Sequence, residues 1–366
     1  MSIILKAVLF VFIFTGCSQN QYSMKNNNGV NSKTSRSYSQ TKEIDREYEN
    51  KFVENFEKKS ELIAIIFPSH TIGKYALEAT NSINTYLINK QKPFSLHVYD
   101  IIIQNKKNIV NVIEKIKSDK ITRVIAMITK DDLKYLHTIS GIENIKFYLP
   151  LINKYDIKYD NESKDLDLTF GAISYMKQFE KLIQYANDKP LVELYGNSGI
   201  GRTLHDYLKD QNIKYSKKID DNNGRYKFFL ENNRRLENSF VFLNTPIVKS
   251  SILLSAINSH ESSISKIIST QLNYTPLLFS LTQERDRKKL VIANSIGKIP
   301  DFLEEYNNMI GNNLRYSWVN YATIIGVEYL LNSNINNFKD LKLVDNQIIY
   351  PIHLYTVGRH SFKLIK

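Results

Sequence analysis

The chain has 366 residues, 42% of them hydrophobic, which is enough to bury one large core or the cores of two lobes. Cys17 is the single cysteine, so no disulfide can join two parts of the chain and stability must come from burial. The formal net charge is +12, which favours acidic partners such as lipid headgroups, wall polymers or nucleic acid. A compositional bias toward Lys, Asn and Ile is the alternative explanation of this charge.

The first 17 residues have the pattern of an export signal. Lys6 is the only charge before Cys17, and the apolar run 7–15 is too short to cross a bilayer, which takes about 20 apolar residues. The run ends in Phe14-Thr15-Gly16-Cys17, which resembles the lipobox of bacterial lipoproteins with Phe in place of the usual Leu. An ordinary cleaved signal or an uncleaved anchor is the alternative.

The lipobox resemblance implies removal of residues 1–16 and a lipid anchor on Cys17 in the cell envelope. Because Ser18 rather than Asp follows the cysteine, the anchor would lie in the outer membrane, facing the periplasm, if the host is Gram-negative. Export argues against nucleic acid as the partner. No other apolar run is long enough to cross a membrane.

Two segments precede the expected folded domain. Residues 17–42 are polar and carry no carboxylate, so we expect a disordered tether. Residues 43–60 are charged and place Tyr48, Phe52 and Phe56 at helical spacing, which predicts a short lead-in helix.

From residue 61 the apolar pattern alternates between strands and helices. Strands are expected over 62–67, 94–103, 124–128 and 147–151, and helices over 72–89, 109–117 and 131–139. Strands that are apolar on both faces and joined by helices predict a mostly parallel sheet with helices on both faces. The polar, acidic stretch 153–167 suggests that the chain crosses between two lobes near 152–170.

The alternation then restarts, so the expected fold class is α/β with two lobes. Residues 341–364 are expected to be extended, with turns at Asp345-Asn346 and Gly358-Arg359. The other expected strands cover 168–173, 191–195, 240–243, 277–279 and 290–293, and the helices cover 175–186, 200–211, 249–259, 301–310 and 317–331.

The order of short motifs over residues 61–366 resembles the type I periplasmic-binding-protein fold, in which a hinge joins two α/β lobes. The sequence IIFPS at 65–69 precedes Gly73 and a helix, and LYG at 194–196 leads into another helix. Asn320-Tyr321-Ala322 stands where the family often has Tyr-Asp-Ala, so the Asp is missing here.

Two branches of that family suggest two functions. A lipidated, basic member with a polar tether resembles the C-terminal domain of Lpo-type activators of cell-wall synthases (penicillin-binding protein activators), in which the fold binds a protein. The other branch is the solute-binding component of ABC importers, whose lobes close on an amino acid or similar small molecule.

Residues that would contact a ligand are expected in loops at the carboxyl ends of strands, because these loops line the cleft in this fold. Ser69, His70 and Thr71 follow the first strand, and Tyr195 resembles a cleft-wall position. The alternatives are a helix cap at Ser69 or Thr71 and an ordinary half-buried tyrosine.

A glycine-rich turn, GNSGIGR at 196–202, follows a strand and opens a helix. Free amides at the helix start could hold an anion, with Ser198 and Arg202 as candidate contacts. The loop matches neither the dinucleotide nor the P-loop pattern, and a capped strand-to-helix turn is the alternative.

No catalytic or metal-binding motif is visible. The seven His form no H-E-x-x-H pattern, and G-x-S-x-G is absent. We therefore expect a non-enzymatic protein without a metal or another cofactor.

The densest basic run follows Glu284 and supplies candidate contacts to an acidic partner: Arg285, Arg287, Lys288 and Lys289. A solvated helix end is the alternative. The favoured function is a lipid-anchored envelope protein that binds a protein or cell-wall partner and helps regulate envelope assembly. The alternative is a solute-binding lipoprotein of an ABC importer for a small molecule such as an amino acid.

Overall fold

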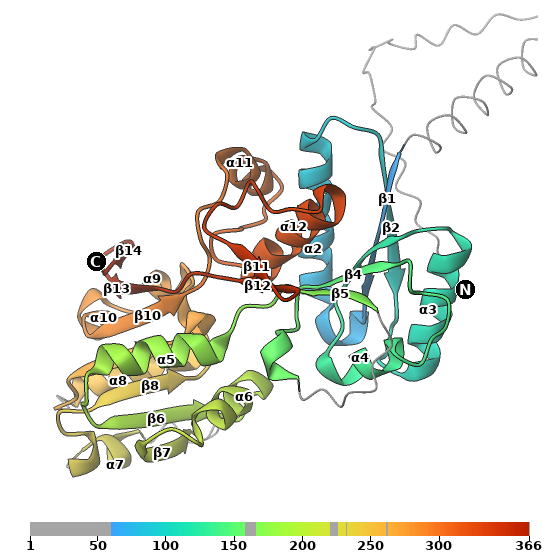
Figure 1. Ribbon diagram of the computed structural model, residues 1–366. Helices are drawn as coiled ribbons and strands as arrows, with labels where there is room; N and C mark the ends of the chain where they lie inside the picture. The colour runs from blue at the N-terminus through green and yellow to red at the C-terminus, as the bar shows by residue number, and fades with distance from the viewer. Residues whose placement is uncertain (1–59, 158–165, 220–225, 232, 261–262, 366) are drawn as a thin grey trace, which may run out of the picture.

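The computed structural model describes residues 60–157, 166–219, 226–231, 233–260 and 263–365 (Figure 1). The expected signal, lipidation site and tether, and the lead-in segment as far as residue 59, lie outside these residues. The described chain forms two lobes, each built on a seven-stranded sheet that is mostly parallel. The predicted two-lobed α/β architecture is therefore confirmed.

The sheet of the first lobe has the order β11-β12-β5-β4-β3-β1-β2. Helices α2, α11 and α12 cover one face, and α3 and α4 cover the other. The strands are β1 (Glu61–Phe67), β2 (Phe94–Asp100), β3 (Arg123–Ala126), β4 (Lys146–Leu149), β5 (Asp167–Phe170), β11 (Lys342–Val344) and β12 (Gln347–Ile349). The helices are α2 (Ser69–Asn89), α3 (Lys106–Ser118), α4 (Lys130–Leu136), the 3-10 turn η1 (Lys154–Asp156), α11 (Asp301–Met309) and α12 (Trp318–Asn332).

The sheet of the second lobe has the order β14-β13-β10-β9-β8-β6-β7. Helices α5 and α6 cover one face, and α7, α8 and α9 cover the other. The strands are β6 (Leu191–Gly196), β7 (Ile213–Ile219), β8 (Phe240–Asn244), β9 (Lys266–Ser269), β10 (Leu290–Asn294), β13 (His353–Val357) and β14 (Phe362–Leu364). The helices are α5 (Tyr175–Ala186), α6 (Gly199–Leu208), α7 (Lys227–Leu230), η2 (Arg234–Leu236), α8 (Ile247–Ser259), η3 (Gln271–Asn273), α9 (Leu277–Leu281) and α10 (Glu284–Arg287).

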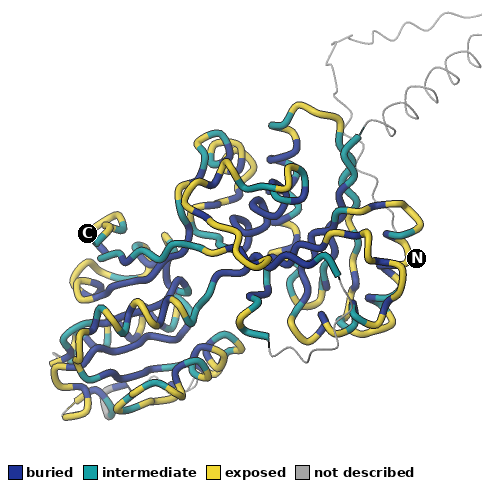
Figure 2. Tube along the Cα trace, viewed as in Figure 1, coloured by how far each residue is buried: buried dark blue, intermediate teal, exposed yellow. Residues whose placement is uncertain are grey.

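The central strands of both sheets are buried, as Figure 2 shows in dark blue. Ile63, Ile65 and Ile125 lie in one core and Val241, Leu243 and Ile292 in another, all of them fully buried. Burial on both faces explains why these strands are apolar along their whole length.

The chain passes between the lobes at three places, 171–174, 295–300 and 350–352. We expected the first crossing near 152–170, but β5 pairs with β4 in the first sheet, so the crossing follows Phe170. The C-terminal helices α11 and α12 return to the first lobe, and therefore the lobes are not two consecutive halves of the sequence.

Several elements differ from the expected ones. The strand expected at 277–279 is helix α9, in which Leu278 is buried while Leu277 and Leu281 are exposed. Strands β7 and β9 were not predicted. β7 is a lysine-rich edge strand and β9 has four residues, so neither carries a strong apolar signal.

Candidate functional site

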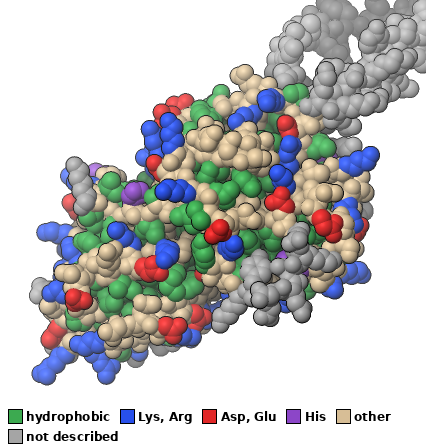
Figure 3. Space-filling view, viewed as in Figure 1, with side chains coloured by type: hydrophobic (Ala, Val, Ile, Leu, Met, Phe, Trp, Pro, Cys, Tyr) green, Lys and Arg blue, Asp and Glu red, His purple; other side chains and the backbone are tan. Residues whose placement is uncertain are grey.

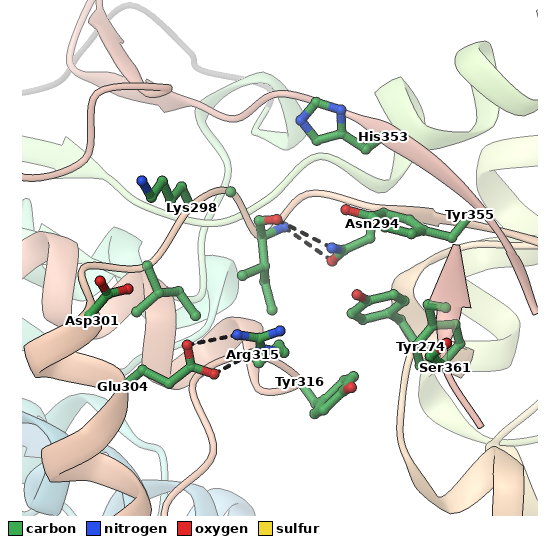
Figure 4. A pocket seen from close by; sticks show the side chains of 14 residues that line it. Tyr274, Asn294, Lys298, Asp301, Glu304, Arg315, Tyr316, His353, Tyr355 and Ser361 are labelled. Atoms are coloured by element: carbon green, nitrogen blue, oxygen red, sulfur yellow. Dashed lines mark hydrogen bonds and ion pairs between the residues drawn. The ribbon is translucent and has the colours of Figure 1, made fainter. Parts of the chain in front are cut away.

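A cavity of about 450 Å³ lies between the two lobes (Figure 4). Its walls come from both of them, so a relative movement of the lobes would change its shape. The first lobe and its connection contribute Ile296, Gly297, Lys298, Ile299, Asp301, Glu304, Arg315 and Tyr316, and the second lobe contributes Tyr274, Asn294, His353, Tyr355, Ser361 and Phe362.

Asn294 is the last residue of β10 and lines this cavity. Its Nδ2 donates to the carbonyl of Ile296 at 3.2 Å, and its Oδ1 accepts from the amide of Ile296 at 3.1 Å. Strand β13 runs antiparallel to β10 with His353 opposite Asn294, which places His353 at the same end of the sheet. The side-chain amide of Asn294 therefore already has a donor and an acceptor in the backbone of Ile296.

Aromatic side chains form one wall of the cavity. The Tyr274 ring lies 4.3 Å from that of Phe362 and 5.3 Å from those of Tyr316 and Tyr355, measured between centroids. Burial raises the pKa of the Tyr274 hydroxyl further above its ordinary range, so this hydroxyl is neutral. This wall offers apolar surface together with neutral hydroxyl groups.

The charges beside this aromatic wall are paired. Arg315 Nε and Nη2 each donate to a different carboxylate oxygen of Glu304 at 2.8 Å, a bidentate geometry (Figure 4). The hydrogen bond to Glu304 raises the pKa of the Arg315 guanidinium. Lys298 and Asp301 add one charge of each sign, so the cavity has no excess charge with which to select a charged ligand.

The predicted cleft residues after β1 lie outside this cavity. The amide of Ser69 donates to Asp100 Oδ1 at 3.0 Å, and the amide of His70 donates to the carbonyl of Ile102 at 3.2 Å. The Thr71 hydroxyl donates to Gln104 Oε1 at 3.5 Å. All three residues in the first turn of α2 are thus engaged with the end of β2 or with the segment that follows it.

The glycine-rich turn after β6 is a capped strand-to-helix turn. Ser198 Oγ accepts from the amide of Gly201 at 3.1 Å, and the guanidinium of exposed Arg202 donates to the carbonyl of Asn197. A Cβ on Gly201 would lie 2.6 Å from the carbonyl oxygen of Gly196, so glycine is required for close packing. These contacts match the alternative considered for this loop.

Tyr195 lies on a side-chain network that the sequence did not predict. Its ring stacks on the His205 imidazole with centroids 3.8 Å apart, and His205 Nδ1 lies 2.7 Å from Glu193 Oε2. Glu193 is fully buried and also accepts from Ser216 Oγ at 3.0 Å and Asn244 Nδ2 at 2.9 Å. The signal in the sequence was a charged residue within the apolar strand LVELYG.

Side chains of the two lobes also meet directly. Tyr175 of α5 pairs with Trp318 of α12, and Tyr207 of α6 pairs with Asp156 of η1. Burial raises the pKa of Asp156, while Tyr207 and Lys130 lower it by less. The lobes therefore hold each other through their own side chains.

The basic run divides into buried and exposed members. Arg287 is only 3% exposed, and its guanidinium donates to carbonyls of Thr282, Gly358 and Arg359. It is an internal residue and, contrary to the expectation, offers no surface to a partner. Arg285, Lys288 and Lys289 are exposed, although Lys289 Nζ donates to the carbonyl of Ile264 at 2.7 Å.

Metal binding and membrane spanning find no support in the part of the chain that the structure describes. There, no three His, Cys, Asp or Glu side chains gather in a group that could hold a metal ion. Within the same residues no helix combines the length and apolar character needed to cross a bilayer.

Comparisons with known proteins identify the fold. No family model and no curated protein matches this sequence. A leucine-binding protein from Thermotoga maritima is similar with a TM-score of 0.57 and 11% identity over 83% of this chain and 97% of its own. A branched-chain amino acid ABC transporter protein from Thermus thermophilus with bound valine gives 0.59 and 13% over 84% and 95%.

The C-domain of LpoA from Haemophilus influenzae, a regulator of PBP1A, is similar as well, with a TM-score of 0.54 and 10% identity over 83% of this chain and 100% of that domain. The chain spans 59% of full-length LpoA. At such identities the likeness establishes the fold, which is the type I periplasmic-binding-protein fold. The resemblance seen in the sequence, including the likeness to the Lpo C-domain, is thus confirmed for the fold.

Proposed function

We propose that the protein is a lipid-anchored, non-catalytic component of the cell envelope that binds a protein or cell-wall partner and helps regulate envelope assembly. The anchor would be Cys17, in the outer membrane if the host is Gram-negative. Tethering through residues 17–42 would let the two-lobed domain reach a partner at some distance from the membrane.

The main support is that several polar groups at the predicted cleft, between the lobes and in the cavity already have partners within the protein. The Ser69 amide at the start of α2 binds the carboxylate of Asp100, and Tyr175 and Tyr207 bind across to the first lobe. In the cavity, Arg315 is committed to Glu304. The likeness to the C-domain of a PBP1A regulator is consistent with a protein partner.

Crosslinking in intact envelopes, followed by recovery of the anchored protein, tests this proposal. We expect one or a few envelope proteins, or wall fragments, to be captured reproducibly. A variant with Arg285→Glu and Lys288→Glu reverses charge at two predicted partner contacts without touching the buried Arg287, and it should recover less of an acidic partner. Recovery of no partner, together with a saturable small-molecule ligand, would contradict the proposal.

Solute binding is the second candidate, because the 450 Å³ cavity is lined by both lobes and falls in the usual size range of ligand sites. A bound solute would raise the melting temperature, because a hundredfold excess of solute over Kd adds about 2.7 kcal/mol to the free energy of unfolding. A thermal-shift screen of amino acids, sugars and nucleosides tests this candidate. Arg315→Ala should abolish a shift that arises in the cavity, whereas Ser69→Ala with Thr71→Ala should abolish one from the predicted cleft.

A further inference from the structure

Helices α8 and α9 form an apolar groove on the outer face of the second lobe. Val248 and Ile252 of α8 and Leu277 and Leu281 of α9 are each between 43% and 59% exposed. Each pair is spaced four residues apart, so its two side chains lie on the same side of their helix. Part of the groove has a volume of about 430 Å³ and is lined by Ile252 and Leu281 together with Ser251, Ser255, Ala256, Ser259 and His260.

Helix α8 lacks the charged outer face that a surface helix normally has. Its 13 residues include one charged side chain, Lys249. The exposed row of Val248, Ile252, Ser255 and Ser259 carries no charge along the length of the helix. Apolar side chains beside small ones let another helix approach closely, which is the geometry of a groove that receives an amphipathic helix.

The net charge of the folded domain lies entirely in the lobe that carries this groove. Residues 60–170 and 295–352 contain 19 Lys and Arg and 19 Asp and Glu, so the first lobe is neutral. Residues 171–294 and 353–365 contain 20 Lys and Arg and 12 Asp and Glu, which gives the second lobe a net charge of +8. Lys and Arg gather at the far end of this lobe on the face in Figure 3, and α10, with exposed Arg285, contacts α8. An acidic helix would complement this lobe.

One segment of the chain itself has that chemistry. Residues 43–59 contain six Asp and Glu against four Lys and Arg, an acidic balance in a basic chain. Ile44, Tyr48, Phe52 and Phe56 recur every four residues, which on a helix forms one apolar stripe.

We propose that residues 43–59 of one copy bind the groove between α8 and α9 of a second copy. Contact within one chain is disfavoured because the segment joins β1 directly, and β1 starts in the first lobe while α8 and α9 lie in the other (Figure 1). If residues 43–59 form a helix, its length would be roughly 26 Å, and only Ser60 stands between residue 59 and the start of β1. Two copies that exchange segments reciprocally form a closed dimer.

Disulfide trapping between different chains tests this contact. The protein used is residues 17–366 with Cys17→Ser, which leaves no cysteine. One preparation carries Phe52→Cys and the other Ser255→Cys, so a bond between them can form only between two copies. We expect the mixed dimer to form under mild oxidation, and to form far less with Thr203→Cys, an exposed hydroxyl residue on α6 at the opposite face of the sheet.

The oligomeric state supplies a second measurement. Light scattering should show that the parent is a dimer. Ile252→Asp or Phe56→Asp should raise the dissociation constant of this dimer about tenfold or more. At a concentration low enough for the parent to be monomeric, both variants should melt as the parent does, since Ile252 is exposed and residue 56 precedes β1. A parent that remains monomeric to 100 µM would overturn the proposal. So would equal trapping at Thr203→Cys, or a bond formed only within a chain that carries both Phe52→Cys and Ser255→Cys.

Discussion

The carboxylate of Asp100 holds the amide of Ser69, with Oδ1 3.0 Å from that nitrogen, and the same oxygen accepts from the amide of Ile102 at 2.7 Å. An aspartate at the end of β2 thereby supplies the negative charge that the free amide at the start of α2 would otherwise attract. The position where the sequence predicted a ligand is occupied by a side chain of the protein.

Asp100→Ala should lower the free energy of unfolding by about 1 kcal/mol, because two backbone amides lose their acceptor at the start of α2. Urea unfolding measures the change. Asp210→Ala is the matched control, an exposed aspartate just beyond α6 that should change stability little. Equal effects of the two substitutions would argue that the Asp100 contacts contribute nothing specific.

Asp156→Asn should stabilise the protein at neutral pH and not at pH 3. Burial raises the pKa of Asp156 in the folded state above its unfolded value of 3.8, so the folded state keeps the proton to a higher pH. The free energy of unfolding of the parent therefore falls as pH rises through this window, while the asparagine variant is unaffected and can still accept from Tyr207. Urea unfolding at pH 3 and pH 7.5 checks this. A parent more stable than the variant at pH 7.5 would contradict it.

Glu193→Ala should lower the free energy of unfolding by about 3 kcal/mol or more, since it leaves the buried Asn244 amide, the Ser216 hydroxyl and the His205 ring without their shared acceptor. Glu193→Gln keeps the shape of the side chain and one acceptor oxygen, so it should lower the free energy of unfolding by less. Thermal and urea unfolding give both values. If the glutamine variant is the less stable of the two, the network is not held by hydrogen bonding.

Cys17→Ser should release the protein from membranes, because the predicted lipid anchor requires the thiol. Fractionation with intact-mass analysis of the parent and variant measures the anchor. The control is Ser18→Ala, which keeps the cysteine. A Cys17→Ser protein that stays with the membrane through the same extraction would count against lipidation.

Much of the fold followed from local patterns. The fully apolar runs around Ile65, Val241 and Val291 specify buried parallel strands, because both of their faces need apolar neighbours. Helix α5 begins and ends at the predicted residues, since Ser174 caps its start and Asn187 ends it in a left-handed conformation. The edge strand β7 and the short helix α9 were missed, because exposed lysines and an apolar triplet give no clear period.

The sequence by itself determined the export-like start, the alternation of strands and helices and the two-lobed architecture, because each rests on the spacing of apolar residues within a short window. Only the tertiary structure decided which side chains contact one another and which are buried. It joined Glu304 to Arg315, Glu193 to His205 and Ser69 to Asp100, and turned Arg287 inward. Such contacts depend on how strands pair and where the chain crosses between lobes, and the local pattern of residues does not carry that information.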